Sequence, residues 1–154
     1  MITAGLLAAS IIFPIPLTVH DAPVGMAPSA YQGTYYNPAD EAYRKCVAQR
    51  EGRFQYGTTG SNGYYVGTYQ MTRALAKGAV WMMTREWRQE YGRETAQAMR
   101  DHLFTHDPTE WSREVWDQAF WTVLNWSDFR AGAHHWAGGR FTCTPGMISY
   151  GGPR

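Results

Sequence analysis

The sequence is poor in the features that mark several large classes of protein. Its net charge is only +1 and no run of basic residues is visible, so it lacks the electrostatic footprint of a nucleic-acid binder. Strand-like alternation is rare, and only two cysteines occur in 154 residues. The length suits one domain with a single core. We therefore predict a mainly α domain with at most a short β-hairpin, near residues 64–69.

The two cysteines lie near the ends of the region with helical periodicity. A disulfide between Cys46 and Cys143 would close a loop of about 97 residues, which is worth roughly 4–5 kcal/mol in the chain-entropy model. Such a bond persists only in an oxidising compartment. We predict this disulfide, and with it an exported protein that is secreted or associated with the cell wall.

The N-terminal region agrees with export. Residues 4–17 form an apolar run that is too short and too interrupted by proline for a comfortable membrane span, but acceptable in a secretory leader. The sequence thus predicts a leader-like segment over 1–30, with transient membrane contact, and a linker over 31–40. The folded domain is expected over 41–143 and a flexible tail over 144–154.

Helical patterns fill the predicted domain. A first helix is expected from Pro38 to about Glu51, with Asn37 as its N-cap. Further helices are expected over 71–77, with a break at Gly78, over 80–100, with a division at Gly92, and from Pro108 to Trp126. Residues 127–140 are rich in glycine and predict a loop.

Glu51 stands out at the end of the first predicted helix. It shares a helical face with Val47 and Tyr43, and a carboxyl on an apolar face is costly to ionise. That environment favours the protonated form that a general acid needs. A loop rich in glycine and tyrosine follows, and flat aromatic rings of this kind line carbohydrate grooves as often as they fill cores. An ordinary residue at the end of a helix is the alternative interpretation.

The order of residues from Cys46 to Met71, CVAQREGRFQYGTTGSNGYYVGTYQM, resembles the resuscitation-promoting-factor and lytic transglycosylase-like domains of actinobacteria and their phages. The resemblance extends over roughly 41–143, through DQAFW at 117–121 and HWAGGRFTC at 135–143. It departs from the family after the acid, where the chain reads Gly-Arg-Phe in place of Ser-Gly-Gly.

The resemblance implies a lysozyme-like domain with a substrate groove. It further implies a monomer that needs no cofactor and cleaves the β-1,4 bond between N-acetylmuramic acid and N-acetylglucosamine in peptidoglycan glycan strands, with Glu51 as the catalytic acid and base. Candidate groove contacts are aromatic or amide side chains: Tyr64, Tyr65, Tyr69, Gln70, Trp126 and Trp136. The altered loop keeps a second hypothesis open, a peptidoglycan-binding module of the same fold without turnover.

Other chemistries compete for the remaining residues. His134 and His135 are adjacent, but no C-x-x-C spacing accompanies them, so we predict no metal site. A nucleophilic Cys46 paired with one of these histidines, as in a cell-wall peptidase, is a weaker alternative to the disulfide. Asp117, Glu110 and Glu114 are the possible second carboxylates, but none is a convincing partner for Glu51. A single acid fits a lytic transglycosylase, in which a hydroxyl of the substrate replaces water, and a lysozyme-like hydrolase stays open.

Overall fold

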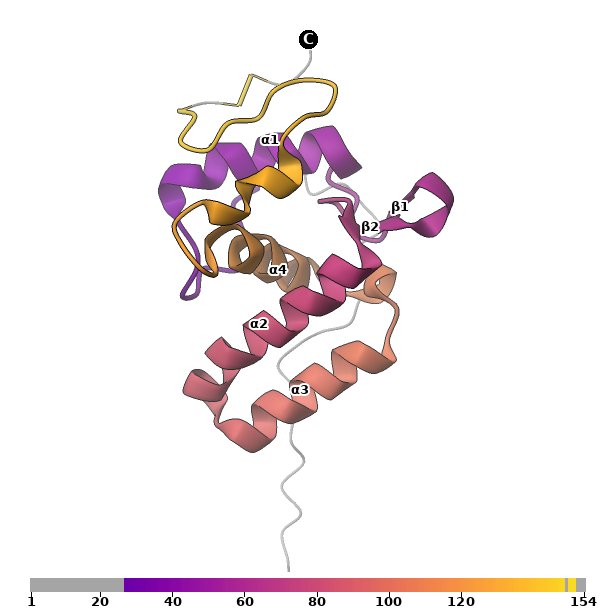
Figure 1. Cartoon of the computed structure of the whole chain (residues 1–154), viewed down its shortest axis with the longest axis vertical. Coiled ribbons are helices and arrows are strands. Elements are labelled where there is room, and N and C mark those ends of the chain that lie inside the picture. Colours follow the sequence, from indigo (N-terminus) through magenta and orange to yellow (C-terminus); the bar gives the residue numbers. More distant parts are fainter. Residues whose placement is uncertain (1–26, 149, 152–154) are drawn as a thin grey trace, which may run out of the picture.

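A computed structural model describes residues 27–148 and 150–151, and it is mainly helical (Figure 1). The prediction of a mainly α domain with a short β-hairpin is therefore confirmed. Four α-helices, three two-residue strands and four 3-10 helices follow one another in this order: η1 (Pro38–Asp40), α1 (Glu41–Gly52), β1 (Thr59–Gly60), η2 (Ser61–Gly63), β2 (Tyr65–Val66), β3 (Met71–Thr72), α2 (Arg73–Tyr91), α3 (Arg93–Thr105), η3 (Pro108–Glu110), α4 (Arg113–Asn125) and η4 (Ala131–Trp136).

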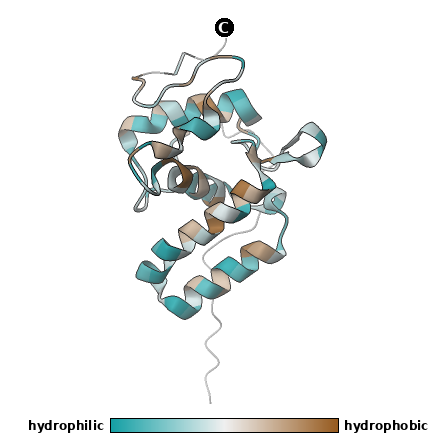
Figure 2. Ribbon diagram, in the orientation of Figure 1, coloured by the Kyte–Doolittle hydropathy of each residue, from teal (hydrophilic) through white to brown (hydrophobic). Residues whose placement is uncertain are grey.

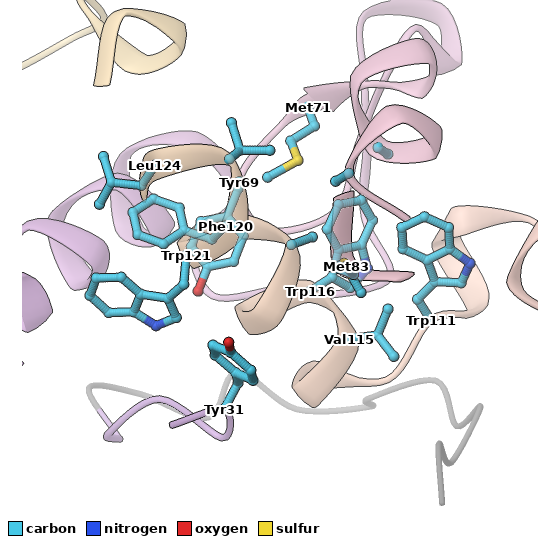
Figure 3. Packing of buried hydrophobic residues seen from close by; sticks show 14 of the residues in the cluster. Tyr31, Tyr69, Met71, Met83, Trp111, Val115, Trp116, Phe120, Trp121 and Leu124 are labelled. Atoms are coloured by element: carbon cyan, nitrogen blue, oxygen red, sulfur yellow. The ribbon is translucent and has the colours of Figure 1, made fainter. Parts of the chain in front are cut away.

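Helix α4 is the centre of the core. Every residue from 115 to 124 is buried, so this helix is surrounded on all sides, as expected of a helix that is apolar around most of its circumference. Its rings pack against those of neighbouring elements: Phe120 stacks on Tyr69 at 4.6 Å between centroids (Figure 3). Phe120 also contacts Trp136, with 4.6 Å between the ring centroids. Ser112 caps the helix by accepting a hydrogen bond from the backbone N–H of Val115.

Helices α2 and α3 form an antiparallel pair on one side of α4, and both carry hydrophilic as well as hydrophobic residues (Figure 2). Gly92, with φ of 84°, separates them as predicted. The break expected at Gly78 is absent, because a glycine in a helix with a packed apolar face weakens the helix without ending it. Instead, α2 begins at Arg73, and its N-cap is Thr72, whose side chain accepts from the N–H of Leu75.

The segment before α1 belongs to the domain and is not the linker that its composition predicts. The backbone N–H of Ser29 donates to Glu41, and that of Ala30 donates to the buried carboxylate of Asp117 at 2.8 Å. Tyr31 is buried and donates its hydroxyl to Glu86. Residues 27–36 therefore wrap the helices, although they contain little periodicity. Of the leader-like segment predicted over 1–30, residues 1–26 lie outside the described residues, whereas 27–30 pack on the domain.

The C-terminal segment also packs on the domain, beyond the boundary expected at 143. The backbone N–H of Gly146 donates to Asp40 at 2.7 Å, while Met147 and Tyr150 pack against the core. The predicted disulfide is confirmed: Cys46 and Cys143 are bonded, with their Cα atoms 5.7 Å apart. It ties the C-terminal segment to the middle of α1. Among the described helices, none combines the length and the apolar composition that crossing a membrane requires.

The three short strands form one antiparallel sheet in the order β1-β2-β3. The connection from β2 to β3 passes directly against the end of α1. A Cβ atom added to Gly52 would lie 2.5 Å from the backbone of Thr68, so only glycine permits this approach. The sheet and the end of α1 are thereby fixed side by side, and the residue that precedes Gly52 faces the space between them.

Candidate functional site

Glu51 lies in the last turn of α1, and its side chain is 27% exposed. The residues that share its face, Tyr43 and Val47, are fully buried, but the carboxylate itself extends past them. The apolar environment expected around this carboxyl is therefore not what the structure shows. Its surroundings are polar, and they open to solvent on both sides.

A buried arginine holds this carboxylate. Nε of Arg50 donates to Oε1 of Glu51 at 2.8 Å. The same guanidinium donates to the carbonyl oxygens of Trp136 at 2.6 Å and of Phe141 at 3.0 Å. Gly139 makes room for it, since a Cβ atom there would lie 2.6 Å from Nε of Arg50. Arg50 therefore links Glu51 to the C-terminal loop and leaves Oε2 of Glu51 without a hydrogen bond in the described part of the chain.

Two open pockets meet at Glu51 and Gln70, and we call them together the Glu51 groove. The first has a volume of about 390 Å³ and lies between β2 and the C-terminal loop. Its lining includes Tyr65, His135 and Trp136. The second, of about 250 Å³, lies between the end of α1 and β1 and is lined by polar and small residues. Glu51 is the only carboxylate among the described residues that line either pocket.

Three of the predicted contact residues line the groove. Tyr65 is partly exposed, and Gln70 reaches both pockets while its amide nitrogen donates to the carbonyl of Gly67. Trp136 is largely buried and offers only an edge, because its indole N–H donates to the carbonyl of Tyr69. Tyr64, 60% exposed, packs edge-to-face on Tyr65 and extends the same surface without lining the pockets.

Two predicted contact residues lie elsewhere. Tyr69 is fully buried, with its hydroxyl 2.5 Å from Oδ1 of Asp117, so it has no surface with which to contact a glycan. Its position in the family-like segment beside Gln70 did not reveal that its side chain turns inward. Trp126 follows α4 and packs against Tyr35 and Arg85, outside the Glu51 groove. The prediction that Tyr69 and Trp126 line the groove is therefore wrong.

The candidates for a second carboxylate are also outside the groove. Asp117 is fully buried and accepts hydrogen bonds from the hydroxyls of Tyr56 and Tyr69. Glu110 closes a capping box with Asp107 at η3. Glu114 lines a separate pocket of about 280 Å³ between residues 30–33 and helices α2, α3 and α4, where burial and the charges of Asp117 and Glu90 raise its pKa.

The described residues do not form the site that either a cysteine nucleophile or a bound metal would need. Cys46 is in the disulfide and no cysteine is free, so the hypothesis of a cysteine nucleophile is wrong. Across 27–148 and 150–151, no three His, Cys, Asp or Glu side chains gather as a metal site would need. The sequence interpretation missed Arg50 as the partner of Glu51 and did not distinguish His135, which faces the groove, from His134, which does not line it.

Comparisons with known proteins do not place the chain in a family. No family model matches it, and neither a curated protein nor a solved structure matches it either.

Proposed function

We propose that this protein cleaves the β-1,4 glycosidic bond between N-acetylmuramic acid and N-acetylglucosamine in peptidoglycan, with Glu51 as the general acid. The observation that supports the proposal best is the position of Glu51, which is the only carboxylate among the described residues that line the groove, beside the aromatic residues Tyr65 and Trp136. The choice of substrate rests on the sequence resemblance. The disulfide fits an extracellular location, where this substrate is found, and export completes the proposal.

The geometry assigns different tasks to the two oxygens of Glu51. Oε1 is fixed by Arg50, so the carboxyl group has a defined orientation. Oε2 has no hydrogen-bond partner among the described residues, and Glu51 lines the groove, so we assign to Oε2 the proton that passes to the bridging oxygen of the glycan. As the bond breaks, the sugar develops oxocarbenium character, and the resulting carboxylate stabilises the positive charge.

Digestion of purified peptidoglycan with mass spectrometry of the products tests the proposal. Glu51→Gln keeps the volume and removes the proton donor, so turnover should fall by about 100- to 10,000-fold. Glu94→Gln, an exposed change on α3, is the matched control and should leave turnover unchanged. Turnover by folded Glu51→Gln protein within about threefold of wild type would show that the acid lies elsewhere.

A peptidoglycan-binding module without turnover is the second candidate. The observation that favours it is the backbone after the acid, where Arg53 and Phe54 both adopt positive φ in place of the family's glycine-rich turn. Wild-type protein that binds insoluble peptidoglycan in a sedimentation assay but releases no products would select this function. Gln70→Ala should then lower the fraction of protein that sediments with peptidoglycan, because Gln70 lines both pockets.

A further inference from the structure

His135 lines the same pocket as Glu51, and the residue after it, Trp136, is bonded to the guanidinium that orients the acid. It lies in η4, immediately before Trp136, and it lines the same pocket as Glu51. The carbonyl of Trp136 and Oε1 of Glu51 both accept hydrogen bonds from Arg50. The width of one guanidinium therefore separates the acid from the backbone next to His135. The imidazole and the carboxylate line a single pocket from different elements.

The charged and titratable groups around His135 favour its neutral form. Partial desolvation lowers the pKa of His135, although the residue is exposed, and the ring of His134, 4.0 Å away between centroids, lowers it further. Arg50 adds a positive charge from α1. Among the described residues that line this pocket, Glu51 is the one acidic group, and Tyr65 contributes a phenol from β2. A neutral imidazole is able to accept a proton at neutral pH.

Hydrolysis of a glycoside needs a second group besides the acid, and the described residues that line the groove include no second carboxylate. We propose that His135 is the catalytic base that accepts a proton from the attacking water. The inference rests on the proposed function and makes it more specific, because it selects hydrolysis over formation of an anhydro product.

In this step the water oxygen forms a bond to the anomeric carbon while the bond from that carbon to the bridging oxygen breaks. Glu51 gives its proton to the leaving oxygen, and His135 takes one proton from the water. The products are a free hydroxyl on one fragment and a new reducing end of inverted configuration on the other. The imidazolium and the carboxylate then return to their starting forms by proton exchange with solvent.

Paired variants of the two adjacent histidines test the proposal. His135→Gln should lower kcat/KM on soluble peptidoglycan chains by about 100-fold or more, the usual contribution of a positioned base. His134→Gln is the matched control, since both histidines are exposed on the same 3-10 helix but only His135 lines the groove. It should retain wild-type activity to within about threefold.

The pH profile separates a base from a structural residue. Wild-type activity should fall as the pH drops through the pKa of His135, because the protonated imidazole cannot accept a proton. This fall in activity at low pH, the acidic limb of the pH profile, should disappear in His135→Gln. Equal losses in the two histidine variants, with the acidic limb retained in His135→Gln, would overturn the assignment.

Chemical rescue provides a second test. Azide attacks without giving up a proton, so it should restore bond cleavage in His135→Ala and leave a glycosyl azide that mass spectrometry detects. Anhydro products from the wild type, or full activity of His135→Gln while Glu51→Gln is inactive, would overturn the role of His135 and leave the proposed function standing. A wild type that cleaves nothing would overturn the proposed function itself.

Discussion

Helix α1 carries two buried arginines, Arg44 and Arg50, and each pairs with a carboxylate in a different environment. Arg44 is buried, and its Nη1 lies 3.6 Å from Oδ1 of the fully buried Asp117 on α4. Its Nη2 lies 2.9 Å from Glu41, which is 15% exposed. Arg50 is equally buried, but its partner Glu51 is 27% exposed. Both arginines come from one helix, yet the carboxylate of Asp117 is inside the core and that of Glu51 is at the edge of a groove.

The difference lies in how completely each carboxylate is satisfied. Asp117 accepts from two tyrosine hydroxyls and one backbone N–H, so its oxygens have no capacity left for a ligand. Glu51 accepts one hydrogen bond and keeps a second oxygen open. A saturated buried network holds a fold together, whereas a carboxylate with a free oxygen beside solvent is available to a substrate. The predictions below test this distinction.

Asp117→Ala should cause the largest loss of stability. It removes the acceptor of Tyr56 and Tyr69 and takes one of two carboxylates away from buried Arg44. Breaking a buried pair from one side typically costs about 3–5 kcal/mol of unfolding free energy. Urea denaturation checks this, with Glu51→Gln as the control that should stay within about 1 kcal/mol of wild type. Equal losses of unfolding free energy in Asp117→Ala and Glu51→Gln would show that the two carboxylates do not differ in their contribution to the fold.

Removal of the disulfide should follow in size. Replacing Cys46 and Cys143 together with alanine should lower the free energy of unfolding by about 2–5 kcal/mol. Because the bond ties α1 to the C-terminal segment, glycan binding should weaken as well. Thermal unfolding with and without reductant provides the control: reductant should destabilise the wild type and leave the double variant unchanged. An insensitive wild type would contradict the prediction.

Two adjacent residues, Tyr69 and Gln70, should separate stability from function. Tyr69→Phe leaves buried Asp117 and Arg44 each short of one partner, which should cost about 1–3 kcal/mol of stability. Gln70→Ala should change stability by less than about 1 kcal/mol but weaken peptidoglycan turnover or binding. Denaturation and product assays on both proteins check this. If Gln70→Ala unfolds the protein while Tyr69→Phe does not, the assignment of core and groove is reversed.

The smallest effect is expected at the exposed pair of Arg73 and Asp107. Burial alone would raise the pKa of Asp107, but the backbone N–H of Thr109 and the guanidinium of Arg73 lower it to about 2. A carboxyl whose pKa falls on folding stabilises the protein above its unfolded value of about 4, and this contribution is lost as the pH drops toward 2. Both side chains are exposed, so solvent screening keeps the contribution small.

Asp107→Asn should therefore reduce the loss of stability between about pH 4 and pH 2. Thermal unfolding across that range measures it, and Asp101→Asn, at another exposed carboxylate paired with an arginine, is the comparison. An unchanged acid dependence in Asp107→Asn would show that this capping carboxylate contributes nothing measurable.

The sequence by itself determined the local features of this protein. Periodicity and capping residues predicted the helices, including the division at Gly92, and the count and placement of cysteines predicted the Cys46–Cys143 bond. The position of Glu51 at the end of a helix, before a run of glycines, also follows from the chain alone. The helices and their ends depend on neighbours within a few residues, and two cysteines allow only one intramolecular disulfide.

Only the tertiary structure decided which side chains meet. Tyr69 is buried and the adjacent Gln70 lines the groove, because a positive φ of 46° at Gln70 turns the chain there. The tertiary structure packed residues 27–36 on the helices, since their backbone N–H groups find carboxylate acceptors far away in sequence. It also brought Arg50 to the carbonyl of Trp136 and so placed His135 in the pocket of Glu51. Contacts between residues this distant depend on the packing of the whole core, which no local pattern encodes.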